Sequence, residues 1–141
     1  MRICLAVLFL LSSSFLFAQS TNDEGAIREM LVKAYVEGIY VNRDREAVMK
    51  GFHPDFVLHV YDDGNLIQAP LEMWLGRLQL DGTRNPESID FEIDLIDITG
   101  NSAIVKMRIF QNSQLLYTDY FGLYKFEDGW KIVNKIFHGH N

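Results

Sequence analysis

Residues 115–138 read LLYTDYFGLYKFEDGWKIVNKIFH and predict two long β-strands joined by a tight turn. Aromatic and aliphatic residues, which favour strands, fill both halves of the stretch. Between the halves, Glu127-Asp128-Gly129 predicts a hairpin with glycine at the position that needs a positive φ. If the turn is a three-residue loop, Phe126 pairs with Trp130 in an antiparallel ladder.

Two further strands precede this hairpin. Residues 103–111 predict one of them, and residues 89–98 predict the other. In residues 89–98, apolar and acidic side chains alternate until the phase changes at Ile96, which indicates a bulge that bends the strand. The C-terminal half of the chain is therefore expected to form an antiparallel meander.

Helical spacing dominates the N-terminal half. An N-cap at Asn22 or Asp23 is followed by apolar residues at helical intervals as far as Ile39. A short helix is predicted to end at Gly51, and a third over residues 71–80 after Pro70. Strands at 56–61 and 65–68 flank the turn at residues 62–64. Helices first and long strands second predict a single α+β domain over residues 19–141, with the helices on one face of the sheet.

The first eighteen residues have the pattern of a secretory signal peptide. Arg2 precedes an apolar run from Cys4 to Leu11, Ser12 to Ser14 interrupt it, and cleavage is expected after Ala18. The apolar run is shorter than the ~20 residues that span a bilayer, which favours cleavage over a retained anchor. We therefore expect a secreted or periplasmic protein with no membrane association after cleavage. Its mature chain has no cysteine, because Cys4 is the only one.

Charge and missing motifs exclude several functions. The chain has a net charge of −6, and removal of Arg2 makes it more negative. Such a surface repels phosphate backbones, so we expect no nucleic-acid partner. The sequence has no glycine-rich phosphate loop, no Gly-x-Ser-x-Gly and no His-Glu-x-x-His. Nucleotide hydrolysis, serine-type acyl transfer and zincin chemistry are therefore unsupported.

Several short motifs resemble one superfamily. They are Tyr35-Val36-Glu37-Gly38, Gly51-Phe52-His53-Pro54-Asp55, Trp74, Tyr117-Thr118-Asp119-Tyr120, and the ending from Asp128 to Phe137. With the order of elements, they are similar to the nuclear transport factor 2-like superfamily, and within it to the secreted lumazine-binding and SnoaL-like proteins. The resemblance implies a cone, in which a curved antiparallel sheet wraps around the N-terminal helices. It leaves the activity open, since the superfamily includes isomerases, dehydratases, epoxide hydrolases and transport factors.

Asp119 is the sharpest candidate site residue in the expected pocket between the sheet and the first helix. The predicted pairing places it on one sheet face with Tyr117 and Phe121, beside Lys135 and Phe137 on the next strand, and we expect these four neighbours to contact the ligand. A carboxylate among apolar residues is desolvated, which would suit a general acid or base. Lys135 lies diagonally across the pair, so a structural ion pair is the alternative.

Three aromatic residues on the helices could contact a ligand. Tyr35 lies on the apolar stripe of the first helix, the region from which superfamily enzymes present a hydrogen-bonding Tyr or Asp. It could instead be a core residue with a solvated hydroxyl. Tyr40 is similar and lies nearer the helix end, and Trp74 could form a wall for a flat ring or simply seal the cone.

Histidines offer weaker candidates. His59 interrupts the strand at 56–61 and could act as an acid or base near neutral pH, or be a half-exposed residue on the polar face.

Metal sites need three or four converging ligands, and no spacing here brings them together. We therefore expect neither a metal nor another cofactor.

Three functions remain open from the sequence. The preferred one is a domain that binds a small apolar or aromatic molecule without converting it. The second is an isomerase, dehydratase or hydrolase with Asp119 as acid or base, and Tyr35 or His59 donating to an oxyanion. The third is an interaction module that forms a homodimer through the other sheet face. The residues assigned to that face are Leu116, Tyr120, Tyr124, Phe126, Trp130, Ile132 and Ile136.

Overall fold

One long helix opens the part of the chain that the computed structural model describes, residues 22–140. The expected signal peptide, residues 1–18, lies outside that range. Residues 22–30 are α-helical, and Leu31–Val41 continue the helix as a π-helix, η1. The apolar stripe is buried as predicted, at Ile27, Leu31, Tyr35 and Ile39. The helix ends where the Asn42 amide donates to the Glu37 carbonyl and Arg43 adopts a positive φ of 51°.

A short helix, α2 (Arg45–Gly51), packs tightly against η1. Asp44 caps it, because its carboxylate accepts hydrogen bonds from the amides of Glu46 and Ala47. Gly51 lets the two helices approach closely: a Cβ there would lie 2.3 Å from the Ala34 Cβ. The close contact fixes where the chain enters the sheet.

The next three elements differ in length from the prediction. Strand β1 (Phe52–Asp62) begins before the predicted strand and runs through the His53-Pro54-Asp55 motif, with an irregular register between Phe52 and Val57. Strand β2 (Asn65–Pro70) leads into α3 (Leu71–Leu75). The predicted helix over 71–80 is wrong beyond Leu75, because the chain turns at Gly76, a residue for which a continued helix is costly.

The sheet has six strands in the order β2-β1-β6-β5-β4-β3. The remaining strands are β3 (Ile89–Thr99), β4 (Ser102–Gln111), β5 (Gln114–Phe126) and β6 (Gly129–Gly139). β3 to β6 form the predicted antiparallel meander, but β6 pairs with β1 in parallel, so the sheet is mixed and not wholly antiparallel. The meander brings its last strand beside β1 in the same direction.

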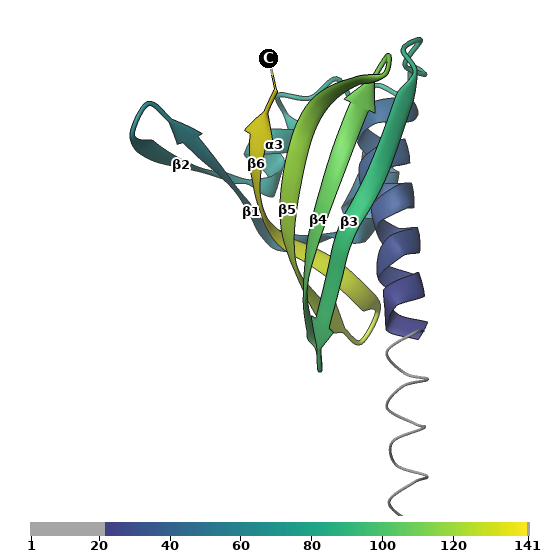
Figure 1. Cartoon of the computed structure of the whole chain (residues 1–141), viewed down its shortest axis with the longest axis vertical. Coiled ribbons are helices and arrows are strands. Elements are labelled where there is room, and N and C mark those ends of the chain that lie inside the picture. The colour runs from purple at the N-terminus through teal and green to yellow at the C-terminus, as the bar shows by residue number, and fades with distance from the viewer. Residues whose placement is uncertain (1–21, 141) are drawn as a thin grey trace, which may run out of the picture.

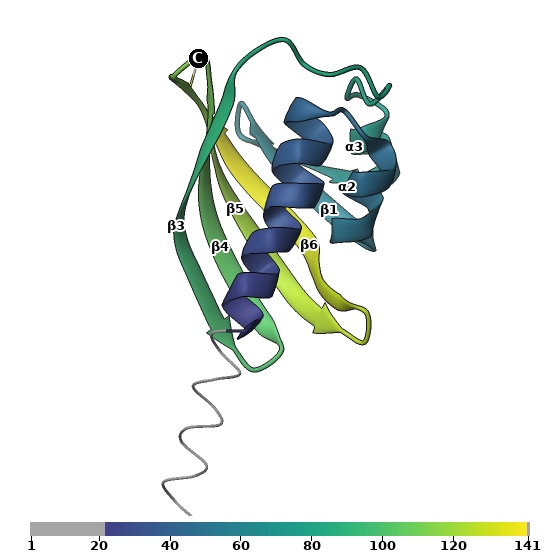
Figure 2. The same cartoon turned by 90° about the vertical axis from the view of Figure 1, so that its right-hand side faces the viewer.

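The curved sheet and the long helix form the predicted α+β cone. Figure 2 shows the helix crossing the concave face of the sheet, while Figure 1 shows the β1–β2 hairpin projecting away from the other strands. Between the helix and the sheet lies one continuous apolar core. Within residues 22–140, no helix combines the length and apolar character needed to cross a membrane.

Two bulges set which side chains face this core. The predicted bulge in β3 is confirmed, since pairing with β4 shifts between Ile93 and Leu95. The predicted pairing of Phe126 with Trp130 is wrong: Phe126 pairs with Gly129, so the turn is shorter than expected. A second shift between Gly122 and Leu123 then restores the expected register farther from the turn.

The one-residue displacement between the turn and the shift at Gly122 changes which sheet face two large residues occupy. Trp130 and Ile132, predicted on the outer face, are buried in the core, at 5% and 0% exposed. They lie between the turn and the bulge, where the alternation is displaced by one residue. Tyr120, Tyr124, Phe126 and Ile136 are exposed as predicted.

Candidate functional site

A buried acid and a buried base meet on the concave face of the sheet. Asp119 on β5 is 0% exposed and Lys135 on β6 is 4% exposed. Asp119 pairs with Phe137, and Phe121 pairs with Lys135, so the two charged residues are diagonal neighbours as predicted. The Lys135 Nζ lies 2.8 Å from the Asp119 Oδ1. Both predicted roles of Asp119 therefore begin from an ion pair.

Two tyrosines extend the pair into a hydrogen-bonded cluster. The Tyr35 hydroxyl donates to the Asp119 Oδ2 at 2.7 Å and accepts from the Lys135 Nζ at 2.5 Å. The Tyr40 hydroxyl lies 3.0 Å from that of Tyr35. A tyrosine has one proton to donate, and that of Tyr35 goes to Asp119, so Tyr40 must be the donor to Tyr35. The lone pairs of the Tyr40 oxygen then remain available to a ligand.

The π-helical geometry of η1 is what brings the tyrosines together. In an α-helix, residues five apart differ in direction by about 140°. A π-helix closes its hydrogen bonds between residues five apart, so Tyr35 and Tyr40 lie nearly one above the other. Single π-helical turns occur often at functional sites. The helix thus presents two hydroxyls at one point of the concave face.

Burial sets the protonation of this cluster. Burial raises the pKa of Tyr35 well above its usual value, and the nearby Tyr40 and Asp119 raise it further. Burial and the charge of Asp119 likewise raise the pKa of Tyr40. Both hydroxyls therefore stay protonated at neutral pH. Burial lowers the pKa of Lys135, and attraction to Asp119 opposes this change only in part.

Aromatic rings surround the Lys135 amine. Five ring centroids lie between 4.8 and 5.9 Å from the Nζ: those of Tyr35, Trp74, Tyr117, Phe121 and Phe137. Aromatic faces attract a cation at such distances. The amine is therefore held by Asp119 on one side and by an aromatic cage around it.

A cavity of about 140 Å³ opens beside this amine. We call it the cone cavity, and its lining residues are Ile39, Tyr40, Leu58, Trp74, Leu78, Tyr117, Lys135 and Phe137. Five of these are residues that the sequence suggested for ligand binding. Phe121 lies deeper, 2% exposed, with its ring packed against Tyr35. A dry cavity of about 150 Å³ holds benzene, so the cone cavity has the size of one aromatic ring.

The Asp119 carboxylate has one oxygen with an incomplete set of partners. Oδ2 accepts the Tyr35 hydrogen bond, while Oδ1 accepts no hydrogen bond from any residue in the range 22–140. Its close contact is the ion pair with the Lys135 ammonium. Buried carboxylate oxygens usually accept hydrogen bonds, so Oδ1 depends on the Lys135 ammonium as its partner.

His59 does not join the cluster. It lies on β1 next to Leu58, which lines the cone cavity, so alternation turns His59 to the opposite face of the sheet. There it lines a larger hollow of about 670 Å³, the outer groove, with Leu66, Tyr120 and Ile136 among its neighbours. A role for His59 as a partner of Asp119 therefore has no geometric support.

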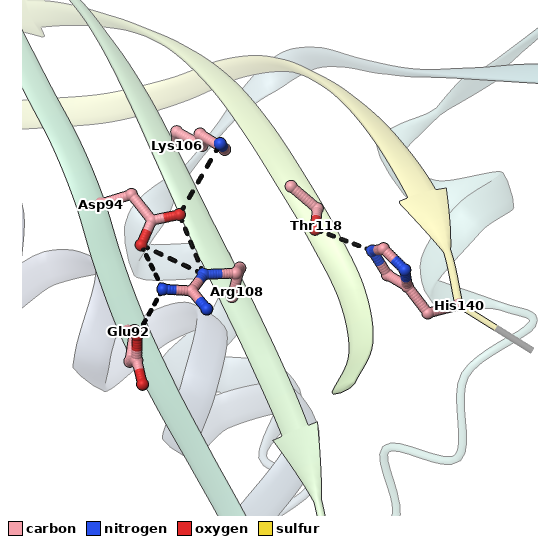
Figure 3. Close-up of polar contacts among 6 residues, drawn as sticks. All are labelled: Glu92, Asp94, Lys106, Arg108, Thr118 and His140. Atoms are coloured by element: carbon pink, nitrogen blue, oxygen red, sulfur yellow. Dashed lines mark hydrogen bonds and ion pairs between the residues drawn. The ribbon is translucent and has the colours of Figure 1, made fainter. Parts of the chain in front are cut away.

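Part of the outer face, on β3 to β5, is polar. Figure 3 shows Arg108 between Glu92 and Asp94, with Lys106 also near Asp94. In the same view, the Thr118 hydroxyl lies 2.9 Å from the His140 Nε2. Within the described part of the chain, no three His, Cys, Asp or Glu side chains gather closely enough to hold a metal ion. The cone cavity is smaller than the outer groove, but it adjoins the buried cluster of Asp119, Lys135 and the two tyrosines, because Tyr40 and Lys135 line it.

Known proteins resemble this chain in sequence and in fold. The sequence matches the profile of the family described as "Putative lumazine-binding" over residues 22–138. It is 33% identical over 107 residues to Aldolase FrzH from Cladobotryum sp, an alignment that covers 75% of this chain and 83% of the relative.

Solved structures agree with the sequence matches. An NTF2-like protein of unknown function from Shewanella baltica OS155 superimposes with a TM-score of 0.74 and 28% identity, covering 86% of this chain and 96% of the other. A putative ketosteroid isomerase from Shewanella frigidimarina NCIMB 400 gives a TM-score of 0.58 at 17% identity, covering 80% and 94% of the two chains. At that identity the second structure shows the fold alone. The predicted NTF2-like cone is confirmed.

Proposed function

Because the chain belongs to the family described as putative lumazine-binding, within the NTF2-like superfamily, we propose that it binds a small planar carbonyl compound in the cone cavity. The observation that carries the proposal is a ring-sized apolar cavity with the Lys135 amine in its wall. Lysine has three N–H donors as an ammonium group, and here one is directed at Tyr35 and one lies beside Asp119. The third supports binding of a carbonyl oxygen.

The walls support a flat apolar body for this ligand. Trp74, Tyr117 and Phe137 offer aromatic surfaces, and Leu58 and Leu78 offer aliphatic ones. The volume of about 140 Å³ suits a single ring. A two-ring compound such as lumazine would have to extend beyond the rim of the cavity.

Thermal unfolding with a panel of compounds tests the proposal. Benzamide and acetophenone present a carbonyl on one ring, while toluene presents the ring alone and lumazine two rings. A ligand that binds only the folded protein raises the Tm as its concentration exceeds the Kd. We expect the single-ring carbonyl compounds to raise the Tm more than toluene or lumazine. The absence of any shift with either carbonyl compound would refute the proposal.

Catalysis on a carbonyl compound is a second candidate, favoured by the buried Asp119 carboxylate beside the Lys135 amine of the cavity wall. A relative is named an aldolase, and aldol reactions begin with removal of a proton next to a carbonyl group. Asp119 would act as the base, while the Lys135 ammonium in the cavity wall stabilises the oxyanion that forms. Deuterium uptake into the methyl group of acetophenone, followed by NMR in D₂O, measures this step. Asp119→Asn should abolish the enzymatic uptake while circular dichroism shows an unchanged fold.

We also propose that the domain acts outside the cytoplasm, after removal of residues 1–18. The charged start, the apolar run and Ala18 before Gln19 support this. N-terminal sequencing of protein recovered from the periplasm or medium of an expressing bacterium should begin at Gln19. Recovery of the intact N-terminus on cytoplasmic protein would contradict it.

A homodimer through the outer sheet face is the remaining proposal. Leu95, Ile104, Tyr120 and Ile136 are large apolar residues that are between 43% and 56% exposed, and all line the outer groove. Such a cluster on a sheet face favours burial against a second copy of the same surface.

A further inference from the structure

We propose that Lys135 is a nucleophilic amine that forms a covalent imine with aldehydes or ketones in the cone cavity. The inference deepens the proposed function and rests on it, because the carbonyl compound must first bind. It differs from simple binding in that a bond forms between the Lys135 Nζ and the carbonyl carbon.

The position of the amine supports this reaction. Lys135 is the one lysine among the residues that line the cone cavity, and its side chain is only 5% exposed. A carbonyl group that accepts a hydrogen bond from the Nζ already lies at the distance from which attack begins. By contrast, the side chain of Lys33 is 67% exposed and paired with Glu29 in water.

A nucleophilic amine must be neutral, and the cluster provides a route for its proton. The Asp119 Oδ1 lies 2.8 Å from the Nζ, close enough to take a proton from the ammonium. The transfer converts two buried charges into two neutral groups, which burial favours. Burial lowers the pKa of Lys135 in the same direction. Desolvated lysines of this kind serve as amine nucleophiles in other proteins.

The remaining steps balance without a further reactant. The amine lone pair forms the N–C bond while the carbonyl π electrons move to oxygen, and the amine loses a second proton to that oxygen. The resulting carbinolamine loses its hydroxyl group as water, with the Asp119 carboxyl group supplying the proton for the leaving oxygen. One amine and one carbonyl compound thus give one protonated imine, one water and an ionised Asp119.

The aromatic cage suits the product as well as the free ammonium. A protonated imine keeps its positive charge on the nitrogen, so the five ring faces and the Asp119 carboxylate still surround a cation. The ring carried by the imine carbon would lie in the cavity between Trp74 and Phe137. No charge is left without a partner after the reaction.

Reductive trapping tests the inference on the wild-type protein. Benzaldehyde and sodium cyanoborohydride at neutral pH should leave one benzyl group per chain, located at Lys135 by peptide mapping. Burial lowers the pKa of Lys135, whereas the contact with Glu29 raises that of Lys33, so more of Lys135 is neutral and it should be labelled faster than Lys33. Lys135→Arg keeps the charge and should lose the fast adduct, whereas Lys33→Arg should keep it.

A second measurement separates this inference from the proposed function. Benzamide, whose carbonyl group does not form imines under these conditions, reports binding alone through the Tm. If benzamide binds while Lys135 reacts no faster than Lys33, the imine is wrong and the binding function stands. If benzamide fails to bind and fails to slow labelling at Lys135, the proposed function is wrong. Fast labelling at Lys135 that benzamide suppresses supports both.

Discussion

The Lys135 Nζ and the Asp119 Oδ1 lie 2.8 Å apart on neighbouring strands, with both side chains almost completely removed from water. A buried ion pair costs desolvation free energy that only close contact between the two charges offsets. The pair is therefore stable as a unit, and each member depends on the other. Function is built on this unit, because Tyr35 links it to Tyr40 and the cavity.

The first prediction concerns the mutual dependence of these charges. Asp119→Asn or Lys135→Met alone should lower the free energy of unfolding by about 3–5 kcal/mol, since each leaves a buried charge without its partner. The double variant should lose much less than the two single losses together, because the introduced amide is neutral and still accepts from Tyr35. Urea unfolding followed by circular dichroism measures the cycle. Lys33→Met, in an exposed pair, is the control and should change little. Additive losses would show that the two charges are independent.

The second prediction concerns access to the cone cavity. Leu78→Trp should fill the space beside Trp74 and raise the Kd for benzamide by about tenfold or more, equivalent to about 1.4 kcal/mol. Leu80→Trp is a matched control, since Leu80 is also partly buried against the core but does not line the cavity. Isothermal titration calorimetry measures both affinities. Equal affinities for the two variants would place the ligand elsewhere.

Much of this site could be predicted from alternation along the strands. Alternation placed Asp119 and Lys135 on one face with Tyr117 and Phe137, and the structure agrees. The predicted register near the turn was wrong by one residue. The bulge beside Gly122 restores the predicted pairing farther along the two strands. Glycine inside a strand indicates a bulge, so Gly122 carried a signal that the predicted register did not use. What the sequence does not show is the hydrogen bond from the Gly122 amide to the Asn134 side chain, a contact that requires the folded sheet. Without the bulge, the predicted faces of Trp130 and Ile132 were wrong.

The helix and β1 show two other limits. The spacing of Ile27, Leu31 and Tyr35 is that of an ordinary α-helix, so nothing in it predicts the π-helical turns that bring Tyr40 beside Tyr35. For His59, a signal was available: Phe56 and Leu58 form the more apolar side of the strand, which indicates that His59 faces outward.

The third prediction concerns the contact between η1 and α2. Gly51→Ala should lower the free energy of unfolding by about 1–3 kcal/mol, because the new Cβ would lie 2.3 Å from the Ala34 Cβ. Adding Ala34→Gly should recover part of that loss by removing the clash. Gly25→Ala is the control: nothing lies within 4 Å of its new Cβ, and alanine should stabilise the helix by up to about 1 kcal/mol. Chemical unfolding of the wild type, Gly51→Ala, the double variant and Gly25→Ala measures the four free energies of unfolding. Failure of the double variant to recover would show that the contact is not the cause.

The fourth prediction concerns acid stability through Asp23. Burial raises the pKa of Asp23, but hydrogen bonds from Lys125 and Trp130 outweigh it, so the net pKa lies below the usual 3.8. A carboxyl group with a lowered pKa in the folded state stabilises the fold above its unfolded pKa, and this contribution is lost as the pH falls through the folded value. Asp23→Asn should therefore lower the Tm near neutral pH, and the difference from wild type should shrink below about pH 4.

Thermal scans from neutral pH to below about pH 4 measure this difference in Tm. A difference that stays constant into acid would show that the charge of Asp23 is irrelevant. Asp55→Asn, at a side chain that is 92% exposed, should leave the Tm unchanged throughout.

The last prediction tests the homodimer. Ile104 is 56% exposed in the apolar part of the outer face, whereas farther along β4 the same face is charged at Lys106 and Arg108. A second copy that covers the apolar part would have to bury position 104, so Ile104→Lys should place an unpaired charge in the interface and give monomers. Multi-angle light scattering should report two chains per particle for the wild type and one for the variant. Met73→Lys, on α3 and 50% exposed, introduces the same charge away from the sheet and should remain dimeric.

A wild-type mass of one chain would overturn the dimer. A dimeric Ile104→Lys variant would show that the interface lies on another surface. Either result leaves the cone cavity as it is, because that cavity opens on the opposite face of the sheet.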